Sequence, residues 1–108
     1  MGILENLEAM LAGGQDSALL RFTIGGELFK RGNAHLATEH LREAVRLDPE
    51  YSAAWKVLGK VLLAQDDVSG ACLAFGQGIE TAERKGDMQA AREMRVFLKR
   101  AQKIGDRS

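Results

Sequence analysis

The segment that decides the fold of this chain is Trp55–Leu63 (WKVLGKVLL), together with Ala71–Phe75 (ACLAF) shortly after it. Large apolar residues recur in the first segment at i, i+3, i+7 and i+8, which is the spacing of one helix face. Gly59 lies on the same face, between the large side chains. The two segments therefore predict the halves of a short helical pair, which needs neighbouring helices to bury both of its faces.

Turn and capping residues divide the rest of the chain into further helices. Glycine commonly ends a helix, and Gly13-Gly14, Gly32-Asn33 and Gly86-Asp87 are such signals. Asp48-Pro49 stops another helix, because proline restricts the residue before it away from the helical region. The sequence has no convincing alternating pattern of a strand. The expected helices are 3–12, 17–31, 34–47, 51–64, 68–84 and 88–104, and the tail 105–108 is expected to fray.

An internal repeat of 34 residues relates the two central helical pairs. When the chain is shifted against itself by this length, apolar and small residues fall on residues of the same kind, whereas the mismatched positions are mostly polar. The matched pairs are Ile24/Leu58, Gly25/Gly59, Leu28/Leu62, Ala37/Ala71, Leu41/Phe75, Ala44/Gly78 and Val45/Ile79. So many matches in one register indicate a duplicated helix–turn–helix unit.

The repeat resembles the 34-residue unit of tetratricopeptide repeat proteins. The second unit supplies the pattern residues Trp55, Leu58, Gly59, Leu62, Ala71 and Phe75. The first unit supplies Ile24, Gly25, Leu28, Gly32, Ala37, Leu41, Ala44 and Pro49. Several positions depart from the pattern: Leu28 and Leu62 stand where tyrosine is usual, Arg21 for Trp, Gly78 for Ala, and Glu83 for Pro.

The resemblance implies an all-α fold, in which antiparallel helix-turn-helix repeats form a right-handed superhelix. A single domain over residues 1–108 would hold one repeat at about 18–51, a second at about 52–85, an N-terminal helix and a C-terminal capping helix at about 87–104. Gly25 and Gly59 would allow close helix approach, and Trp55 and Phe75 would fill the core between helices.

Composition bounds the chemistry and the location of the protein. Net charge is zero, but residues 84–108 carry eight basic and three acidic side chains (8 − 3 = +5), which leaves −5 before them. One cysteine, Cys72, excludes an internal disulfide and fits a reducing compartment. The apolar start contains Glu5 and Glu8 and no basic residue, unlike a signal peptide. No apolar run reaches the roughly 20 residues of a membrane span. A cytoplasmic protein without a membrane partner is expected.

Candidate catalytic and metal sites are weak. His35 and Glu39 share a helix face, but a metal site needs three or four ligands and no further histidine or cysteine supplies them. Cys72 is expected to be a small buried apolar residue rather than a nucleophile. The sequence therefore predicts no enzyme activity, no metal and no cofactor.

The resemblance places the candidate site on a concave groove lined by the first helix of each repeat. Such a groove would hold a peptide or helix of another protein, in an adaptor or scaffold role. Phe22 and Phe29 are the most informative residues, because both lie off the core face of their helix. The groove residues implied by position are Phe22, Gly26, Phe29, Lys30, Lys56, Lys60, Leu63 and Met94.

Other interpretations remain open at this point. The N-terminal helix can cover Phe22 and Phe29 with its own leucines, or the terminal helices can form a two-fold homodimer. The basic C-terminal helix can bind RNA or a membrane surface, although Phe97 alone interleaves its cations, which disfavours nucleic acid. Some relatives grip a chaperone's terminal carboxylate, but only Lys56 and Lys60 match that residue set, so this ligand is disfavoured.

Overall fold

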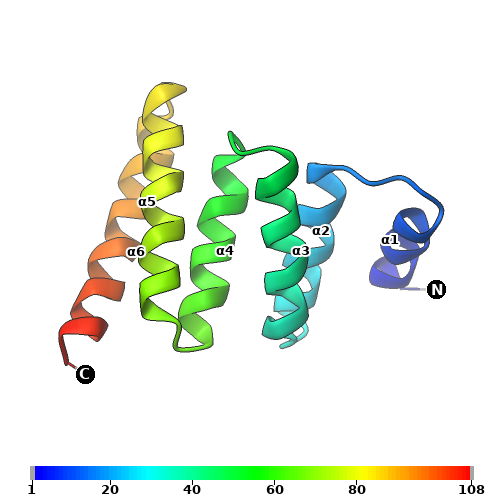
Figure 1. Cartoon of the computed structure of the whole chain (residues 1–108), viewed down its shortest axis with the longest axis horizontal. Coiled ribbons are helices and arrows are strands. Elements are labelled where there is room, and N and C mark those ends of the chain that lie inside the picture. Colours follow the sequence, from blue (N-terminus) through cyan, green and yellow to red (C-terminus); the bar gives the residue numbers. More distant parts are fainter. Residues whose placement is uncertain (1, 108) are drawn as a thin grey trace.

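The protein is all-helical in the computed structural model, which describes residues 2–107. Six helices follow one another along an elongated array of 43 × 32 × 19 Å (Figure 1). Their bounds are α1 Ile3–Ala12, α2 Ala18–Lys30, α3 Ala34–Leu47, α4 Ser52–Ala64, α5 Val68–Arg84 and α6 Met88–Arg107. The all-α prediction is therefore confirmed, and α1 lies at one end of the array with α6 at the other.

Side-chain caps and tight turns set where the helices begin and end. Ser17, Asn33, Asp67 and Asp87 each accept a hydrogen bond from a backbone N–H in the first turn of the following helix, at 3.0–3.3 Å. These bonds satisfy donors that have no partner within the helix itself. The turns between paired helices are consequently short, and the pairs α2–α3, α4–α5 and α5–α6 pack along their lengths.

Helix α6 continues to Arg107, so the expected fraying from residue 105 is wrong over the described part of the tail. A Cβ added to Gly105 would stand 3.3 Å from a methyl group of Val68, at the start of α5. The last turn of α6 therefore packs against the neighbouring helix, which stabilises it. Ser108 lies outside the described residues.

The two repeats use the same close contact between glycine and a large side chain. A Cβ on Gly25 would stand 2.7 Å from Leu41 Cγ, and a Cβ on Gly59 would stand 2.5 Å from Phe75 Cε1. Leu41 and Phe75 are both fully buried and are 34 residues apart. The repeat that relates the sequences of the two pairs therefore also relates their packing.

Trp55 is only partly enclosed, so its prediction as a core residue needs correction. The indole packs against the core but remains half-buried, and its N–H donates a 2.8 Å hydrogen bond to the Pro49 carbonyl. A side chain with an apolar body and a polar edge suits this position at the start of α4. Phe75, in contrast, is completely buried, as predicted.

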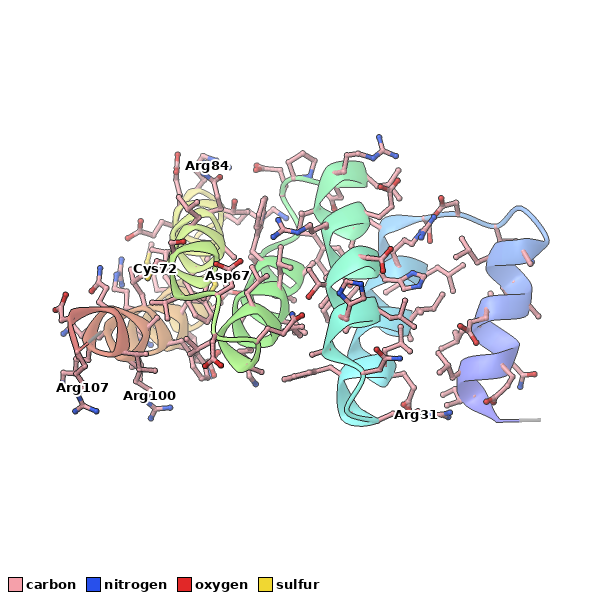
Figure 2. All side chains as sticks on the ribbon, turned by 60° about the horizontal axis from the view of Figure 1, so that its bottom comes forward. Arg31, Asp67, Cys72, Arg84, Arg100 and Arg107 are labelled. Atoms are coloured by element: carbon pink, nitrogen blue, oxygen red, sulfur yellow. The ribbon has the colours of Figure 1, made fainter. Side chains whose placement is uncertain are left out.

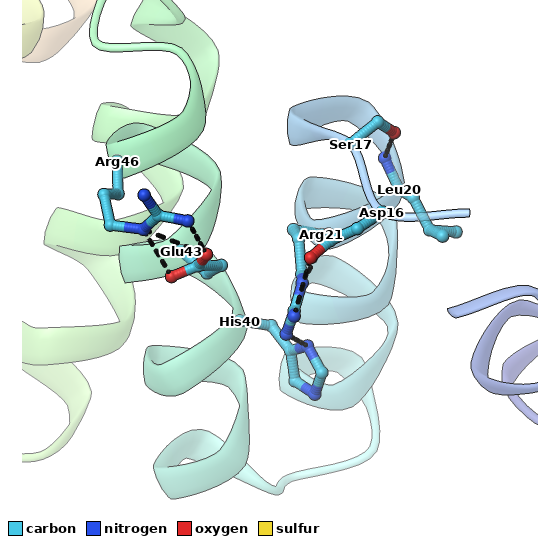
Figure 3. A network of polar contacts seen from close by, with 7 residues as sticks. All are labelled: Asp16, Ser17, Leu20, Arg21, His40, Glu43 and Arg46. Atoms are coloured by element: carbon cyan, nitrogen blue, oxygen red, sulfur yellow. Dashed lines mark hydrogen bonds and ion pairs between the residues drawn. The ribbon is translucent and has the colours of Figure 1, made fainter. Parts of the chain in front are cut away.

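A polar network connects α2 and α3 near their N-terminal side (Figure 3). Arg21 forms two hydrogen bonds with the Asp16 carboxylate, at 2.9 and 3.1 Å, and its guanidinium lies 3.3 Å from Nδ1 of His40. Arginine only donates, so His40 accepts through Nδ1 and the neutral ring carries its proton on Nε2. Burial lowers the pKa of His40, and Arg21 lowers it further against the smaller opposing effects of Glu8 and Glu39.

This network predicts a stability change near neutral pH. The pKa of His40 in the folded chain lies below its ordinary value of 6.5, so the unfolded chain takes up the proton first. The free energy of unfolding should therefore fall as the pH drops through about 6.5 toward the folded pKa. Urea unfolding at a series of pH values measures this slope. His40→Asn should flatten it, whereas His35→Asn keeps His40 and should preserve it; equal slopes in both variants would contradict this assignment.

No helix within residues 2–107 is both long enough and apolar enough to cross a membrane.

Candidate binding groove

A groove of about 470 Å³ opens between α1, α2 and α4. Its walls are mostly apolar, and lysine side chains stand at its edge. The lining residues are Ile3, Leu7, Phe22, Thr23, Gly26, Glu27, Phe29, Lys30, Val57 and Lys60. Because α2 and α4 are the first helices of the two repeats, the groove lies on the face that the sequence pattern singled out.

Two phenylalanines and a glycine on one face of α2 form the inner wall of the groove. Phe22 and Phe29 are half-buried, and both belong to the groove lining. A Cβ on Gly26, between them along the helix, would meet nothing within 4 Å, so the wall is open there. The Phe22 ring also packs on Tyr51, with centroids 4.9 Å apart and planes tilted by 40°. Burial raises the pKa of the Tyr51 phenol, which keeps it neutral in this contact.

Helix α1 forms one side of the groove and does not fill it. It packs closely against α2 alone among the described helices, and Leu4 is its one fully buried residue. Leu7 is half-buried, and Ile3 remains 58% exposed at the edge of the groove. The expected alternative, in which this helix covers both phenylalanines, is therefore only partly met: α1 supplies an apolar wall and leaves the groove accessible.

Cationic side chains stand at the edge of the groove and extend it toward α6. Neither Lys30 nor Lys60 forms an ion pair within residues 2–107. Lys60 Nζ lies 5.3 Å from the ring centroid of Phe97, and the Arg100 guanidinium lies 5.6 Å from the same centroid. Phe97 is half-buried and stacks on Phe75 at 5.7 Å. Lys60 thus joins the groove to a cation–aromatic cluster of Lys60, Phe97 and Arg100.

A second hollow of about 310 Å³ lies between the N-terminal parts of α4 and α6, and it is more polar. Lys56 lines it, with its Nζ 3.7 Å from an oxygen of Glu93, so this cation already has a partner. Ser52, Asp87 and Gln89 contribute further polar groups to the lining. The two hollows therefore differ in character: the first is apolar with unpaired cations, and the second is polar with a paired one.

The structure separates the eight residues predicted for the groove. It brings five of them together in the apolar groove: Phe22, Gly26, Phe29, Lys30 and Lys60. Lys56 belongs to the polar hollow, and Leu63 is half-buried and lines neither hollow.

Met94 is a correction, because its side chain is fully buried. A Cβ on Gly78 would stand 2.3 Å from the Met94 sulfur, so this side chain fills the space that the glycine leaves. Met94 therefore belongs to the core beneath α6 and offers no surface to a partner.

Some groove residues were not predicted from the sequence. Ile3 and Leu7 were expected only as a possible cover, and Val57 was not singled out. Phe97 and Arg100 lie more than 35 positions from Lys60 along the chain, and only the packing of α6 on α4 brings them together. A signal for Val57 did exist, since it lies three positions before Lys60 on the same helix face.

The arrangement is suited to non-covalent binding. Within residues 2–107, no group of three or more histidine, cysteine or acidic side chains is placed to hold a metal ion. The groove can bury apolar side chains against aromatic rings and attract negative charge with its lysines.

Comparison with known proteins bears on the same point. No family model matches the chain. The curated TPR repeat-containing protein PA0015 of Pseudomonas aeruginosa is 50% identical over 98 residues, which make up 91% of this chain and 93% of that protein.

Solved structures of similar fold agree with this relative. Protein BPP2914 from Bordetella parapertussis is 46% identical, with a TM-score of 0.81 over 95% of this chain and 90% of that chain. A tetratricopeptide repeat domain protein from Salinibacter ruber is 28% identical, with a TM-score of 0.74 over 80% and 87% of the two chains. MamA, at 23% identity and a TM-score of 0.73 over 93% of this chain and 57% of its own, shares the fold. The chain therefore belongs to the tetratricopeptide repeat (TPR) proteins.

Proposed function

We propose that this protein binds a segment of another protein in the groove between α1, α2 and α4. TPR proteins are in general non-enzymatic protein–protein interaction modules. The observation that carries the proposal is the half-buried pair Phe22 and Phe29, which lines an open groove of about 470 Å³ beside unpaired lysines. Clefts of this size and apolar character are typical of binding sites.

The proposed role is that of a small cytoplasmic adaptor or scaffold. The groove supplies an apolar surface and charge, and no acid–base pair or nucleophile lines it in a catalytic arrangement within residues 2–107. Binding energy in such interfaces concentrates in a few buried aromatic contacts. Phe22 and Phe29 are therefore the residues on which partner capture should depend most strongly.

Two groove variants test the proposal. Phe29→Ala removes an aromatic contact, and Lys60→Glu reverses a charge at the edge, so each should weaken partner capture by at least about tenfold. Pull-down with the purified chain, followed by titration of the captured partner, measures the loss. Leu73→Ala is a matched control, because Leu73 is 72% exposed and lies outside the groove.

Circular dichroism and thermal unfolding of each variant separate lost binding from lost structure. Lys60 is exposed, so its replacement should leave the fold intact. Unchanged capture by both groove variants would show that the partner binds elsewhere.

A further inference from the structure

We propose that the groove selects a protein segment with two features: a large apolar side chain, and a carboxylate about one helix spacing away from it. This inference rests on the proposed function and names the chemistry of its partner. It follows from the placement of an apolar hollow and a cation–aromatic cluster side by side on the same face.

The apolar half of the site is the hollow between α1, α2 and α4. Phe22, Phe29 and Val57 line it from two helices, and Leu7 lines it from a third. Gly26 leaves open space where any other residue would place a Cβ. An entering leucine, methionine or phenylalanine side chain would thus meet apolar atoms on three sides, and the chain already exposes Ile3 as a further apolar contact at the edge.

The cationic half of the site is the cluster of Lys60, Phe97 and Arg100. Both cations lie within 6 Å of the same ring centroid, and neither forms an ion pair within the described chain. Many other cations in the molecule do have carboxylate partners, as Lys56 has Glu93 and Arg95 has Glu83. A carboxylate from a partner would complete the cluster, because it would meet two positive charges held together by one ring.

The position of Arg100 supports an exposed site. Arg100 and Arg107 extend from α6, at the end of the array opposite to Arg31, and their side chains project away from the body of the helix bundle (Figure 2). Arg100 is exposed, and so is Lys60. The cluster is therefore open to a ligand that lies across α4.

The distance between the two halves sets the spacing within the ligand. The hollow lies between α2 and α4, and the cluster lies between α4 and α6, so they are separated by about one interhelix distance of 8–10 Å. An extended segment covers this distance with about three residues, at about 3.3 Å each. A helical segment covers it with about six residues, at about 1.5 Å each. The expected ligand therefore carries an aspartate or glutamate about three or about six positions from its apolar anchor.

The lining favours a protein segment over single-stranded RNA. RNA binding uses exposed aromatic rings for stacking along a groove of continuous positive charge. Here Glu27 lines the groove, Glu93 stands beside it, and Phe97 is already stacked on Phe75. These carboxylates and the shared ring reduce the surface that a polyanion would need.

Peptide selection tests the inference directly. The folded full-length chain is used to select from a random 12-residue peptide library displayed on phage, in parallel with Lys60→Glu and Lys99→Glu. We expect the parent chain to enrich peptides with a large apolar residue and an acidic residue at one of the two spacings. Lys60→Glu should lose the acidic preference. Lys99→Glu makes the same charge change on the exposed surface of α6, away from the groove, and should keep it.

Synthetic peptides then give the magnitude. Replacing the acidic residue of a selected peptide with lysine should weaken its binding to the parent chain by at least tenfold, as measured by isothermal titration calorimetry. The same lysine peptide should bind Lys60→Glu more tightly than the acidic one, because the charges are then exchanged.

The outcomes separate this inference from the proposed function. Selected peptides that require Phe29 but show no acidic preference, and keep their consensus in Lys60→Glu, would overturn the inference and leave the groove function standing. Peptides that bind equally well after Phe29→Ala, or no selected peptides at all, would overturn both. A 12-nucleotide oligouridylate that displaces the peptides and binds more tightly would overturn the inference in favour of a nucleic-acid surface.

Discussion

Replacing Phe75 with alanine should lower the free energy of unfolding by about 3–5 kcal/mol. Phe75 is the largest fully buried side chain, and it packs between Gly59 of α4 and Phe97 of α6. Its removal leaves a cavity that the surrounding helices cannot close, because the backbone of α4 already lies against the ring. For a domain with about 5–15 kcal/mol of stability, this loss approaches complete unfolding.

Urea unfolding followed by far-ultraviolet circular dichroism measures the effect. Leu73→Ala, two positions earlier on α5, provides the control, because this leucine is 72% exposed and its loss should change stability by no more than about 0.5 kcal/mol. A loss below about 1 kcal/mol for Phe75→Ala would show that the ring does not carry the contact between the two helices.

Replacing Gly59 with alanine should destabilise the protein by about 1–3 kcal/mol. The new Cβ would stand 2.5 Å from Cε1 and 2.7 Å from Cδ1 of Phe75, and this ring is enclosed on all sides. Alanine would favour the helix by about 1 kcal/mol over glycine, so the expected net loss means that the clash exceeds the gain in helix propensity. Thermal and urea unfolding measure the sign.

Two further variants test the cause of this loss. Gly76→Ala places a Cβ where nothing lies within 4 Å, so it should stabilise the chain by about 0.4–1 kcal/mol. Phe75→Leu shortens the ring that Gly59→Ala would strike, so the second substitution should cost less in the Phe75→Leu background than alone. Additive effects of the two substitutions would contradict a direct contact as the cause.

Much of the helical architecture was predictable because its signals are local. The bounds of α3 and α5 agree with the expected 34–47 and 68–84, since Asn33 and Asp67 cap these helices with their own side chains. The end of α6 was wrong by three residues. Its last turn is stabilised by contact with Val68, and no local signal in the tail reports that contact.

The candidate groove was predictable only in part. Phe22 and Phe29 stand out in the sequence because they are large and lie off the core face of their helix, and both line the groove. Met94 was wrong because a family position was carried onto α6, where Gly78 opens space that its side chain fills. Whether a residue on a terminal helix faces partner or core depends on how that helix rotates against its neighbour.

The sequence by itself determined the repeat of helical pairs, because caps, turn residues and apolar spacing act within one helix or one turn. It also determined that Gly59 and Phe75 meet, since the 34-residue repeat fixes which faces oppose each other. The tertiary structure alone decided the shape of the groove. The side of the groove formed by α1, and the meeting of Lys60 with Phe97 and Arg100, depend on helices that pack from distant parts of the chain. Their relative placement results from the summed packing of many side chains, which no local pattern encodes.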